Sequence, residues 1–592
     1  MKTRKYMIKN SLAVCLACCC MTFASAGTPP FFPTDVCLGN QGELLFTQKG
    51  MKRVDVFSSD ATQLLHSFPL DETPTGMLVD GNKAYVTTFE KTGRLQILSL
   101  ETGRVEASIP TGSGACHPMF GPDKKHIYVC NQFAGTVSEI DPVMRKVVRN
   151  AQVLREPKSA VFSKDGNYLF VSNFLPAQRA DVDYVAASVS VIEMKNFKKV
   201  KDIQLANGSN ALRGMCITPD GKYIYVSHNL GRFAVPTSQL QQGWMNTSAF
   251  SVIDVEKQAF EGAIVVDEPD RGAAGIWSIA CNDQSIFITH SGTHEVSVID
   301  HPALRKKFEA YPDKSVLDYD LTFLYGLRKR IPLEGNGPRN IVLANDKLIV
   351  PTYFADILNI LDTRDLSLRA IPLNPDREES IENRGERYFN DAANCFQNWQ
   401  SCNGCHPGDA RTDGMNWDLM NDGVGNPKNC KSLLFSHVTP PSMISGIRAT
   451  AEVAVHAGFK FIQFFDIDPE HAECVDAYLK SLRPVPSPYL VNGDLSDKAK
   501  EGRKVFEKAG CGECHSGPYF TDLKMHRIGE EVEFEAGWDT PTLREVWRTA
   551  PYLFNGRAAT MEEVFSVYKH GLDKKKVSKK EIEALTEYVN SL

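Results

Sequence analysis

The chain has 592 residues, of which 42% are hydrophobic and 23% are charged, a composition typical of a globular protein with several domains. Its formal net charge of −6 provides no basic excess to meet phosphate, so we exclude nucleic acid as a partner. Beyond the first 26 residues, no stretch approaches the run of about 18 apolar residues that crosses a membrane, so we expect no transmembrane span.

Residues 1–26 have the three parts of a secretory signal peptide: basic residues, an apolar run over residues 11–23 and a small-residue cleavage site at residues 24–26. We therefore expect export to the periplasm or cell envelope. Cys18 and Cys19 lie in a context that partly resembles a lipoprotein signal, so a lipid anchor is the less favoured alternative.

Residues 27–375 repeat one β-rich unit with a period of roughly 40 residues in the first four units. The second strands of the units are aromatic or β-branched runs at residues 44–47, 84–87, 127–130, 169–172, 224–227, 286–289 and 348–351. Four strands in each of seven units predict a seven-bladed β-propeller. Insertions at residues 230–247 and 301–337 are expected to be loops on one face, where binding tends to reside.

After Pro372 the alternating strand pattern ends, and apolar residues recur at helical spacing. A polar linker at residues 378–390 leads into a helix, and further helices are predicted at residues 468–482, 496–509 and 580–592. Ser578 and Glu581 form the sequence signature of a capping box for the last helix.

Two Cys-x-x-Cys-His motifs lie in this helical part. The first consists of Cys402, Cys405 and His406, and the second consists of Cys511, Cys514 and His515. Two thiols three residues apart can bond both vinyl groups of one haem, and the adjacent histidine can then bind the iron. Zinc or a dithiol would not need the histidine, so the motifs favour two covalently bound haem c groups. They predict two mainly α-helical cytochrome c domains, at residues 380–490 and 491–592.

Eight other cysteines follow the signal peptide: Cys37, Cys116, Cys130, Cys216, Cys281, Cys395, Cys430 and Cys474. An exported chain meets an oxidising compartment, so some of them can pair, but the sequence does not give the connectivity. Cys130, Cys216 and Cys281 fall in predicted strands, which favours buried, small apolar side chains at these positions.

Residues 383–592 resemble the bacterial di-haem cytochrome c peroxidase family, including the MauG type that matures methylamine dehydrogenase. The matching segments are residues 385–389, 502–506, 515–522, 539–544, 549–552, 555–557 and 562–564. The propeller resembles the YVTN repeat family, some members of which are joined to such di-haem segments. Its fold is also similar to that of the propeller subunit of methylamine dehydrogenase.

The resemblance implies an oxidoreductase in which a small redox donor protein supplies electrons to the second haem, while peroxide or another oxidant is reduced at the first. His406 and His515 would be the proximal ligands. Tyr568 would be the distal ligand of the second haem, with His570 as its close competitor. A calcium ion between the haem domains is a further expectation.

At the first haem, the segment from residue 445 to 452 lies where the family has a Trp-Asp-Gly-Arg stretch. His456 and Glu452 are the candidates for moving a proton above the iron, and Arg448 could pair with a haem propionate. The family tryptophan between the haems is absent, because Met443 and Ile444 occupy its place.

Two other functions stay open. One is MauG-like oxidation of a protein or small molecule held by the propeller, which Tyr568 favours, and the other is non-enzymatic electron transfer with the propeller docking a partner, which the missing tryptophan would permit. Trp417, Trp538 and Trp547 are candidate electron relays in place of the missing tryptophan. His228 and His290 follow equivalent strands and are interpreted as hydrogen-bonded channel residues rather than ligands.

Overall fold

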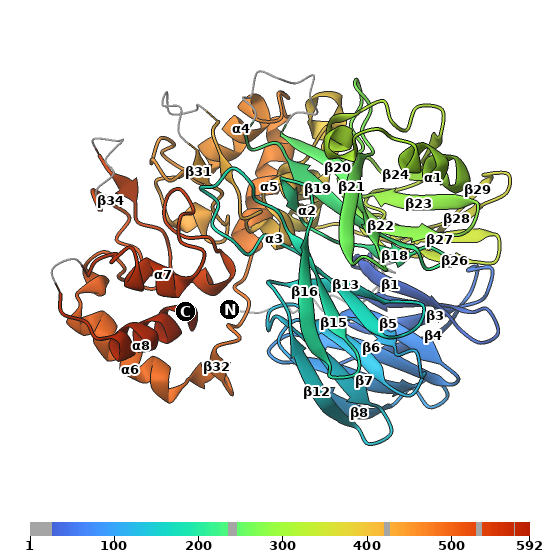
Figure 1. The fold of residues 1–592 in the computed structure, drawn as a ribbon, viewed down its shortest axis with the longest axis horizontal. Coiled ribbons are helices and arrows are strands. Elements are labelled where there is room, and N and C mark those ends of the chain that lie inside the picture. The colour runs from blue at the N-terminus through green and yellow to red at the C-terminus, as the bar shows by residue number, and fades with distance from the viewer. Residues whose placement is uncertain (1–26, 235–244, 420–426, 529–535, 573–574) are drawn as a thin grey trace, which may run out of the picture.

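The computed structural model describes residues 27–234, 245–419, 427–528, 536–572 and 575–592, so the predicted signal peptide lies outside the described residues. The chain forms a β-propeller followed by a mainly helical region that packs against it (Figure 1). No helix in these ranges is long and apolar enough to cross a membrane.

Seven antiparallel sheets form the blades, which confirms the predicted propeller. Blades 1 to 3 contain β1 (Pro33–Leu38), β2 (Leu44–Gln48), β3 (Arg53–Phe57), β4 (Leu64–Pro69), β5 (Pro74–Asp80), β6 (Lys83–Phe89), β7 (Gly93–Ser99), β8 (Val105–Pro110), β9 (Ala115–Phe120), β10 (Ile127–Asn131), β11 (Thr136–Asp141) and β12 (Lys146–Gln152). Blade 4 contains β13 (Pro157–Phe162), β14 (Tyr168–Asn173), β15 (Ser188–Glu193) and β16 (Lys198–Gln204).

The later blades carry the insertions. Blade 5 contains β17 (Ser209–Asn210), β18 (Met215–Ile217), β19 (Tyr223–Gly231), β20 (Asn246–Asp254) and β21 (Ala259–Val265). Blade 6 contains β22 (Ile276–Cys281), β23 (Ser285–His290), β24 (Glu295–Asp300) and β25 (Arg328–Pro332), and blade 7 contains β26 (Val342–Ala344), β27 (Lys347–Pro351), β28 (Ile357–Asp362) and β29 (Leu368–Pro372).

Burial explains the pattern of apolar and polar residues along the strands. The second strands, such as β2 and β10, are buried at every residue because neighbouring blades stack on both of their faces. Outer strands such as β12 expose about every second residue, so they carry charged and polar side chains. Blade 1 closes on blade 7 through a shared apolar core and through Asp356, which accepts hydrogen bonds from the backbone N–H groups of Phe31 and Phe32 at 2.9 and 3.2 Å.

The two insertions are more regular than the predicted loops. The described part of the first insertion lengthens β19 and β20 into nine-residue strands that reach toward the helical region. The second insertion contains α1 (His301–Glu309) and the 3-10 helix η2 (Lys314–Tyr319), where Leu304 and Leu317 pack into the core of blades 5 and 6. The prediction of loops was therefore wrong for most of this second segment, because apolar residues at helical spacing bury against the blades.

The helical region consists of two consecutive units. The first contains α2 (Ile381–Asn390), η3 (Ala392–Asn394), η4 (Phe396–Asn398), η5 (Cys402–Gly404), α3 (Pro407–Ala410), β30 (Asn416–Trp417), β31 (Lys428–Asn429), η6 (Ser436–Val438), α4 (Ala451–Phe461) and α5 (Pro469–Ser481). The second contains β32 (Leu490–Val491), β33 (Asp494–Leu495), α6 (Asp497–Lys508), η7 (Cys511–Glu513), β34 (Met525–His526), β35 (Trp538–Asp539), η8 (Val546–Arg548), α7 (Met561–Ser566) and α8 (Lys579–Asn590).

The predicted helices at residues 468–482, 496–509 and 580–592 are confirmed as α5, α6 and α8, the last with its capping box. Both units cross two helices at a glycine. A Cβ at Gly385 would lie 1.8 Å from Cys474 O, and one at Gly502 would lie 1.9 Å from Ala584 O, so each crossing needs a residue without a side chain. The shared crossing indicates an internal duplication.

Buried ion pairs join the two helical units to each other and to the propeller. Arg411 of the first unit donates to Glu545 of the second at 2.7 Å, and both side chains are almost fully buried. Arg548 lies 3.5 Å from Glu156 of the propeller, whereas Arg155 donates to the backbone carbonyls of Arg548 and Ala550. These contacts fix the position of the helical units on the propeller, because separating them would leave buried charges unpaired.

Candidate functional site

The two histidines of the Cys-x-x-Cys-His motifs have the same environment. His406 Nδ1 lies 3.0 Å from Arg411 O, and His515 Nδ1 lies 3.1 Å from Phe520 O. A hydrogen bond from Nδ1–H to a carbonyl leaves Nε2 as the ligand atom, as is usual for a histidine that binds a metal. Burial lowers the pKa of both imidazoles and so favours the neutral form that binds a metal.

One continuous cavity of about 700 Å³ contains both motifs. Its lining includes the four motif cysteines Cys402, Cys405, Cys511 and Cys514 together with His406 and His515. The volume falls in the range of roughly 300–1,000 Å³ that is usual for small-molecule and cofactor sites. Thiols and a free histidine nitrogen that face a largely apolar cavity fit a covalently attached haem at each motif.

His570 faces His515 across the second motif. The two imidazole ring centres are 6.3 Å apart, and both side chains line the cavity. Two imidazoles that each bind one metal ion at about 2.0 Å place their ring centres roughly 6 Å apart. The spacing therefore fits two histidines that would bind one iron if haem is attached at the second motif.

Tyr568, the predicted distal ligand, also lines the cavity. Its hydroxyl donates to Arg557 O at 2.8 Å, and the Arg557 guanidinium lies 4.7 Å from the centre of its ring. These two contacts hold the phenol among neighbouring protein groups, and the ligand role of Tyr568 stays a prediction beside that of His570.

The first motif has a different distal side. Thr450 and Thr560 cap α4 and α7 in the same way, so Gly458 and Lys460 of the first unit correspond to Tyr568 and His570 of the second. Whereas α7 ends at Ser566, α4 continues as a helix to Phe461 and presents Ala454, Ala457 and Gly458 to the cavity. None of these three side chains can bind iron.

The three catalytic candidates of the first unit do not come together. Arg448 lines the cavity, as the sequence predicts. His456 and Glu452 are correctly placed on α4, but His456 is exposed to solvent and Glu452 forms an ion pair with Lys480 at 2.9 Å, away from the cavity lining. The hydrogen bond from Lys480 holds the pKa of Glu452 at about 2. Both side chains therefore lie on the outer face of an amphipathic helix, which does not favour their predicted distal role.

The segment that replaces the family tryptophan lies between the two units. Met443 and Ile444 line the cavity, and Ile444 O accepts a hydrogen bond from Asp539 N of the second unit at 2.9 Å. Trp417 and Trp538 also line the cavity, whereas Trp547 packs against Phe133 of the propeller. Trp417 and Trp538 therefore remain possible relays, and the position of Trp547 favours a structural role.

Sequence reasoning missed a buried polar group behind the first motif. Asp413 accepts a hydrogen bond from Trp417 Nε1 at 2.8 Å, and burial raises the pKa of Asp413 to about 7. Cys430 lies beside it, with its sulfur 3.2 Å from Cys405 O and 3.5 Å from His406 Nδ1. The sequence shows these residues close to the motif, but it cannot show that their side chains turn toward the histidine.

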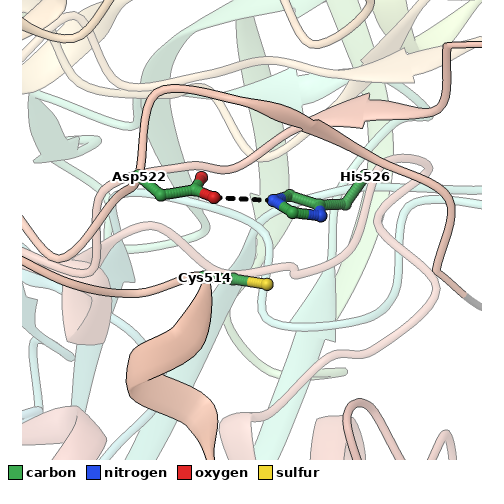
Figure 2. Close-up of side chains that lie close together, drawn as sticks. All are labelled: Cys514, Asp522 and His526. Carbon is green, nitrogen blue, oxygen red and sulfur yellow. Dashed lines mark hydrogen bonds and ion pairs between the residues drawn. The ribbon is translucent and has the colours of Figure 1, made fainter.

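Cys514, Asp522 and His526 bring three potential ligand atoms within 4.8 Å of one another (Figure 2). Asp522 and His526 form an ion pair at 2.8 Å, and Cys514 belongs to the second motif, where a thioether bond would consume its sulfur. This set lies within one unit and is not the all-oxygen environment that calcium prefers. It gives no support to the expected calcium ion between the units, which stays a prediction.

His228 and His290 are fully buried and saturated with hydrogen bonds. His228 bonds Asn229 O and Ser251 Oγ, and His290 bonds Ala273 O and Ser297 Oγ, all at 2.7 to 2.9 Å. Burial lowers the pKa of His228 to about 4 and that of His290 to about 3. The hydrogen-bonded interpretation is therefore supported.

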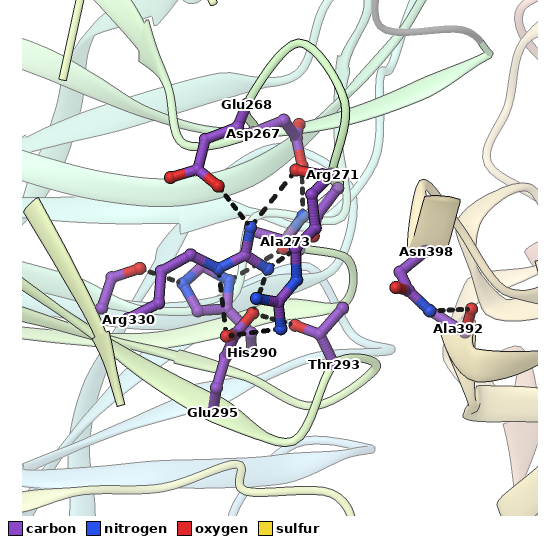
Figure 3. Close-up of polar contacts among 12 residues, drawn as sticks. Asp267, Glu268, Arg271, Ala273, His290, Thr293, Glu295, Arg330, Ala392 and Asn398 are labelled. Carbon is purple, nitrogen blue, oxygen red and sulfur yellow. Dashed lines mark hydrogen bonds and ion pairs between the residues drawn. The ribbon is translucent and has the colours of Figure 1, made fainter. Parts of the chain in front are cut away.

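Figure 3 shows that His290 belongs to a larger polar network in blade 6, close to the helical region. Glu295 pairs with Arg330, which also lies 3.1 Å from Glu268. The neighbouring Gly272 N donates to Gln397 O at 2.8 Å, beside the turn that carries the first motif. The network thus orders the propeller loop on which the first helical unit rests.

Fold and site together define a seven-bladed propeller joined to a duplicated helical region with two Cys-x-x-Cys-His motifs. No family model matches the chain. It is 27% identical over 270 residues to hydrazine synthase subunit gamma of Kuenenia stuttgartiensis, covering 35% of this chain and 76% of that subunit. It is also 28% identical over 215 residues to subunit beta of the same enzyme, covering 35% of this chain and 53% of the subunit.

Shorter similarity reaches the MauG family. The methylamine utilization protein MauG of Methylorubrum extorquens is 32% identical over 93 residues, covering 13% of this chain and 26% of that protein. A solved structure of Kuenenia stuttgartiensis hydrazine synthase matches 59% of this chain and 99% of its own with a TM-score of 0.53 at 18% identity, which concerns the fold. The chain is thus a seven-bladed β-propeller related to hydrazine synthase, with partial similarity to MauG and cytochrome c peroxidases.

Proposed function

We propose that the chain is an exported di-haem c-type oxidoreductase of the peroxidase-like kind. Its first haem site would react with peroxide, and its second would pass electrons to the first. The observation that carries the proposal is the difference between the two distal sides: His570 faces His515, whereas the residues that α4 presents to the cavity at the first motif are apolar and carry no ligand atom. A site without a protein ligand on one side leaves room for an external molecule.

Bound haem would supply redox chemistry at both sites, held by the motif cysteines and by His406 and His515. In the first unit, the residues around the site then determine access. Arg448 offers a cation at the cavity wall, and Phe461 and Met443 narrow the apolar distal space. Arg448 is suited to bind a propionate or to orient an anionic or polar oxidant.

The contact between the units would keep the two sites in fixed relation. Ile444 and Asp539 join the units by a backbone hydrogen bond, and Trp538 stacks on Phe554 at 4.3 Å next to this contact. Both aromatic rings line the shared cavity. This arrangement supports electron transfer through the contact between the units in place of the missing family tryptophan.

The test is peroxide turnover with a reduced small cytochrome or a synthetic donor, using the haem-loaded full chain. Paired variants remove each attachment site separately: Cys402→Ala with Cys405→Ala, and Cys511→Ala with Cys514→Ala. We expect both pairs to lose turnover, while only the second pair keeps a haem that reacts with peroxide. A first site that does not react with peroxide in the wild-type protein would reject the proposal.

A second candidate function follows from the comparisons. The chain resembles two different subunits of hydrazine synthase, and its own fold joins a propeller and a two-motif helical region in one polypeptide. Redox chemistry on a small nitrogen compound would therefore be the alternative at the first site. Hydrazine formation or consumption by the loaded protein, in the absence of peroxide turnover, would favour it.

A further inference from the structure

The propeller axis carries a ring of cations that the proposed function does not use. The first strands of neighbouring blades contact each other around the axis, for example β13 with β18, β18 with β22, and β22 with β26. Equivalent positions can be identified from repeated hydrogen bonds between strands. Ser159, Gly214 and Ser278 each donate their backbone N–H to a hydroxyl on the following strand at 2.9 to 3.1 Å.

The residues directly before these three are Lys158, Arg213 and Trp277. The same equivalence extends to blade 7, because Ser227 donates to Trp277 O as Thr289 donates to Arg339 O. Four successive blades therefore place Lys158, Arg213, Trp277 and Arg339 at one level of the axis. Three of the four are cations.

The two arginines converge on one indole ring. The guanidinium carbon of Arg213 lies 4.5 Å from the centre of the Trp277 ring, and that of Arg339 lies 4.3 Å from it. Arg339 also lies 3.7 Å from the centre of the Tyr353 ring. Aromatic faces stabilise such cations, but each contact contributes only about 0.5–2 kcal/mol and leaves the N–H donors available.

Within the described part of the chain, none of the three cations forms an ion pair. Lys158 donates to Gln132 Oε1 at 3.0 Å, and Arg213, which is 6% exposed, reaches only two backbone carbonyls at 3.3 and 3.4 Å. Arg339 Nε is buried without a hydrogen-bond partner. Burial and the neighbouring Arg339 lower the pKa of Arg213 to about 9. Holding these like charges close together therefore lowers the stability of the folded protein.

The helical region covers this end of the axis. Arg213 also lines a separate small cavity of about 10 Å³, enough for about one water molecule, together with Asn403 and Gly404 of the first haem-attachment turn; Trp277 and Arg339 do not line it, so it shows only that Arg213 adjoins this turn. Asp409 of the same unit is an acidic group near the ring. Although burial opposes its ionisation, Lys49, Arg548, Arg411 and Lys158 lower its pKa to about 2, and it forms no ion pair with the ring cations within the described residues.

We propose that this end of the propeller axis binds a small anion, an oxyanion or a carboxylate, between Arg213 and Arg339 and against Trp277. The anion would accept hydrogen bonds from the two guanidinium groups, which form no ion pair within the described residues. Such a site lies beside the turn that carries Cys402 and Cys405, so an anionic substrate or effector would be held next to the first haem site. The inference does not depend on peroxide chemistry.

The test uses the full-length, haem-loaded protein, with sulfate and acetate as probes at constant ionic strength. We expect each bound probe to raise the melting temperature and to give a saturable heat in calorimetry, and the larger effect identifies the class of anion. Arg339→Met and Arg213→Met should each weaken binding by about tenfold or more, and the double variant should abolish it. Without anion, Arg213→Met should melt no lower than the wild type, because a buried, unpaired charge is removed.

Arg364→Met is the matched control, because Arg364 is an exposed arginine of blade 7 that pairs with Asp362 at 2.8 Å. It should respond to the probes as the wild type does. Equal responses of the wild type, the double variant and Arg364→Met would overturn the proposal, as would no response of the wild type. If Arg213→Met does not fold, the double variant Arg213→Lys with Arg339→Met is used in place of the double methionine variant. It keeps one positive charge at residue 213 but removes both guanidinium groups from the Trp277 ring.

Discussion

The two helical units share the same arrangement around their motif histidines but differ in the residues on the opposite side of the cavity from His406 and His515. In both units a histidine directly follows the second cysteine of the motif, and its Nδ1 lies within hydrogen-bond distance of a backbone carbonyl. In both units a threonine also caps the N-terminus of a later helix, α4 in the first unit and α7 in the second. In the second unit the helix stops early and the chain turns His570 toward His515. In the first unit the helix continues, and small residues leave the distal space open. The two units therefore differ in helix length and in the residues that follow the cap, and under the proposed function this difference would separate an electron-transfer site from a reactive one.

The largest expected effect comes from removing the distal ligand of the second site. His570→Ala should convert the second haem from low spin to high spin, because the His570 ring faces His515 at 6.3 Å and the substitution removes its imidazole. Visible absorption and electron paramagnetic resonance of the oxidised protein measure the change. Tyr568→Phe is the control and should leave both spectra unchanged; a spectral change there, with none in His570→Ala, would restore Tyr568 as the ligand.

The reverse change should close the first site. Gly458 corresponds to Tyr568, and a Cβ at Gly458 would meet no other atom within 4 Å, so a larger side chain fits. Gly458→His should place an imidazole above the first haem, lower its high-spin fraction and reduce peroxide turnover by more than about tenfold. Gly458→Ala, which adds no ligand, should keep wild-type turnover. Unchanged turnover in the histidine variant would show that the distal face lies elsewhere.

The ion pair between the units should matter for stability. Glu545→Gln leaves the buried Arg411 without its carboxylate, and we expect the free energy of unfolding to fall by about 3–5 kcal/mol. Urea denaturation followed by circular dichroism and haem absorbance measures the loss. Glu452→Gln breaks an exposed pair and should cost less than about 1 kcal/mol. Similar losses in both variants would contradict the structural role of the buried pair.

The propeller should lose stability in mild acid independently of the haem units. The folded-state pKa of His228 is about 4, below the ordinary value of about 6.5, so the unfolded chain binds the proton more readily. Its contribution is therefore full above pH 6.5 and is lost as the pH falls toward 4, by up to about 3 kcal/mol. His228→Gln should flatten this pH dependence of unfolding. His66→Gln, at an exposed position, should not; equal slopes in all three proteins would reject the assignment.

Much of the fold could be predicted because its signals are local and repeated. The runs at residues 127–130 and 169–172 mark strands that stack on both faces, and the cap at Ser578 marks the start of α8. The insertion at residues 301–337 was harder, because its helix forms only where Leu304 finds the core of blades 5 and 6.

The candidate site likewise contains residues that the sequence predicts and residues that it does not. The spacing of the cysteines and the histidine within each motif predicts their chemistry from the sequence alone. The residues on the distal side cannot be predicted in this way, because their role depends on which face of a helix lines the cavity. Glu452 and His456 were chosen by sequence position, and both turned out to lie on the outer face of α4. Cys216 and Cys281 show the same limit: they lie on neighbouring blades with their sulfur atoms 3.5 Å apart, which no spacing in the sequence reveals.

The difference between the two haem sites is tested most directly by electron paramagnetic resonance of the oxidised, haem-loaded wild-type protein. The structure predicts one high-spin and one low-spin ferric centre in equal amounts, the low-spin centre with the signature of two axial histidines. Two low-spin centres, or two high-spin centres, would contradict it.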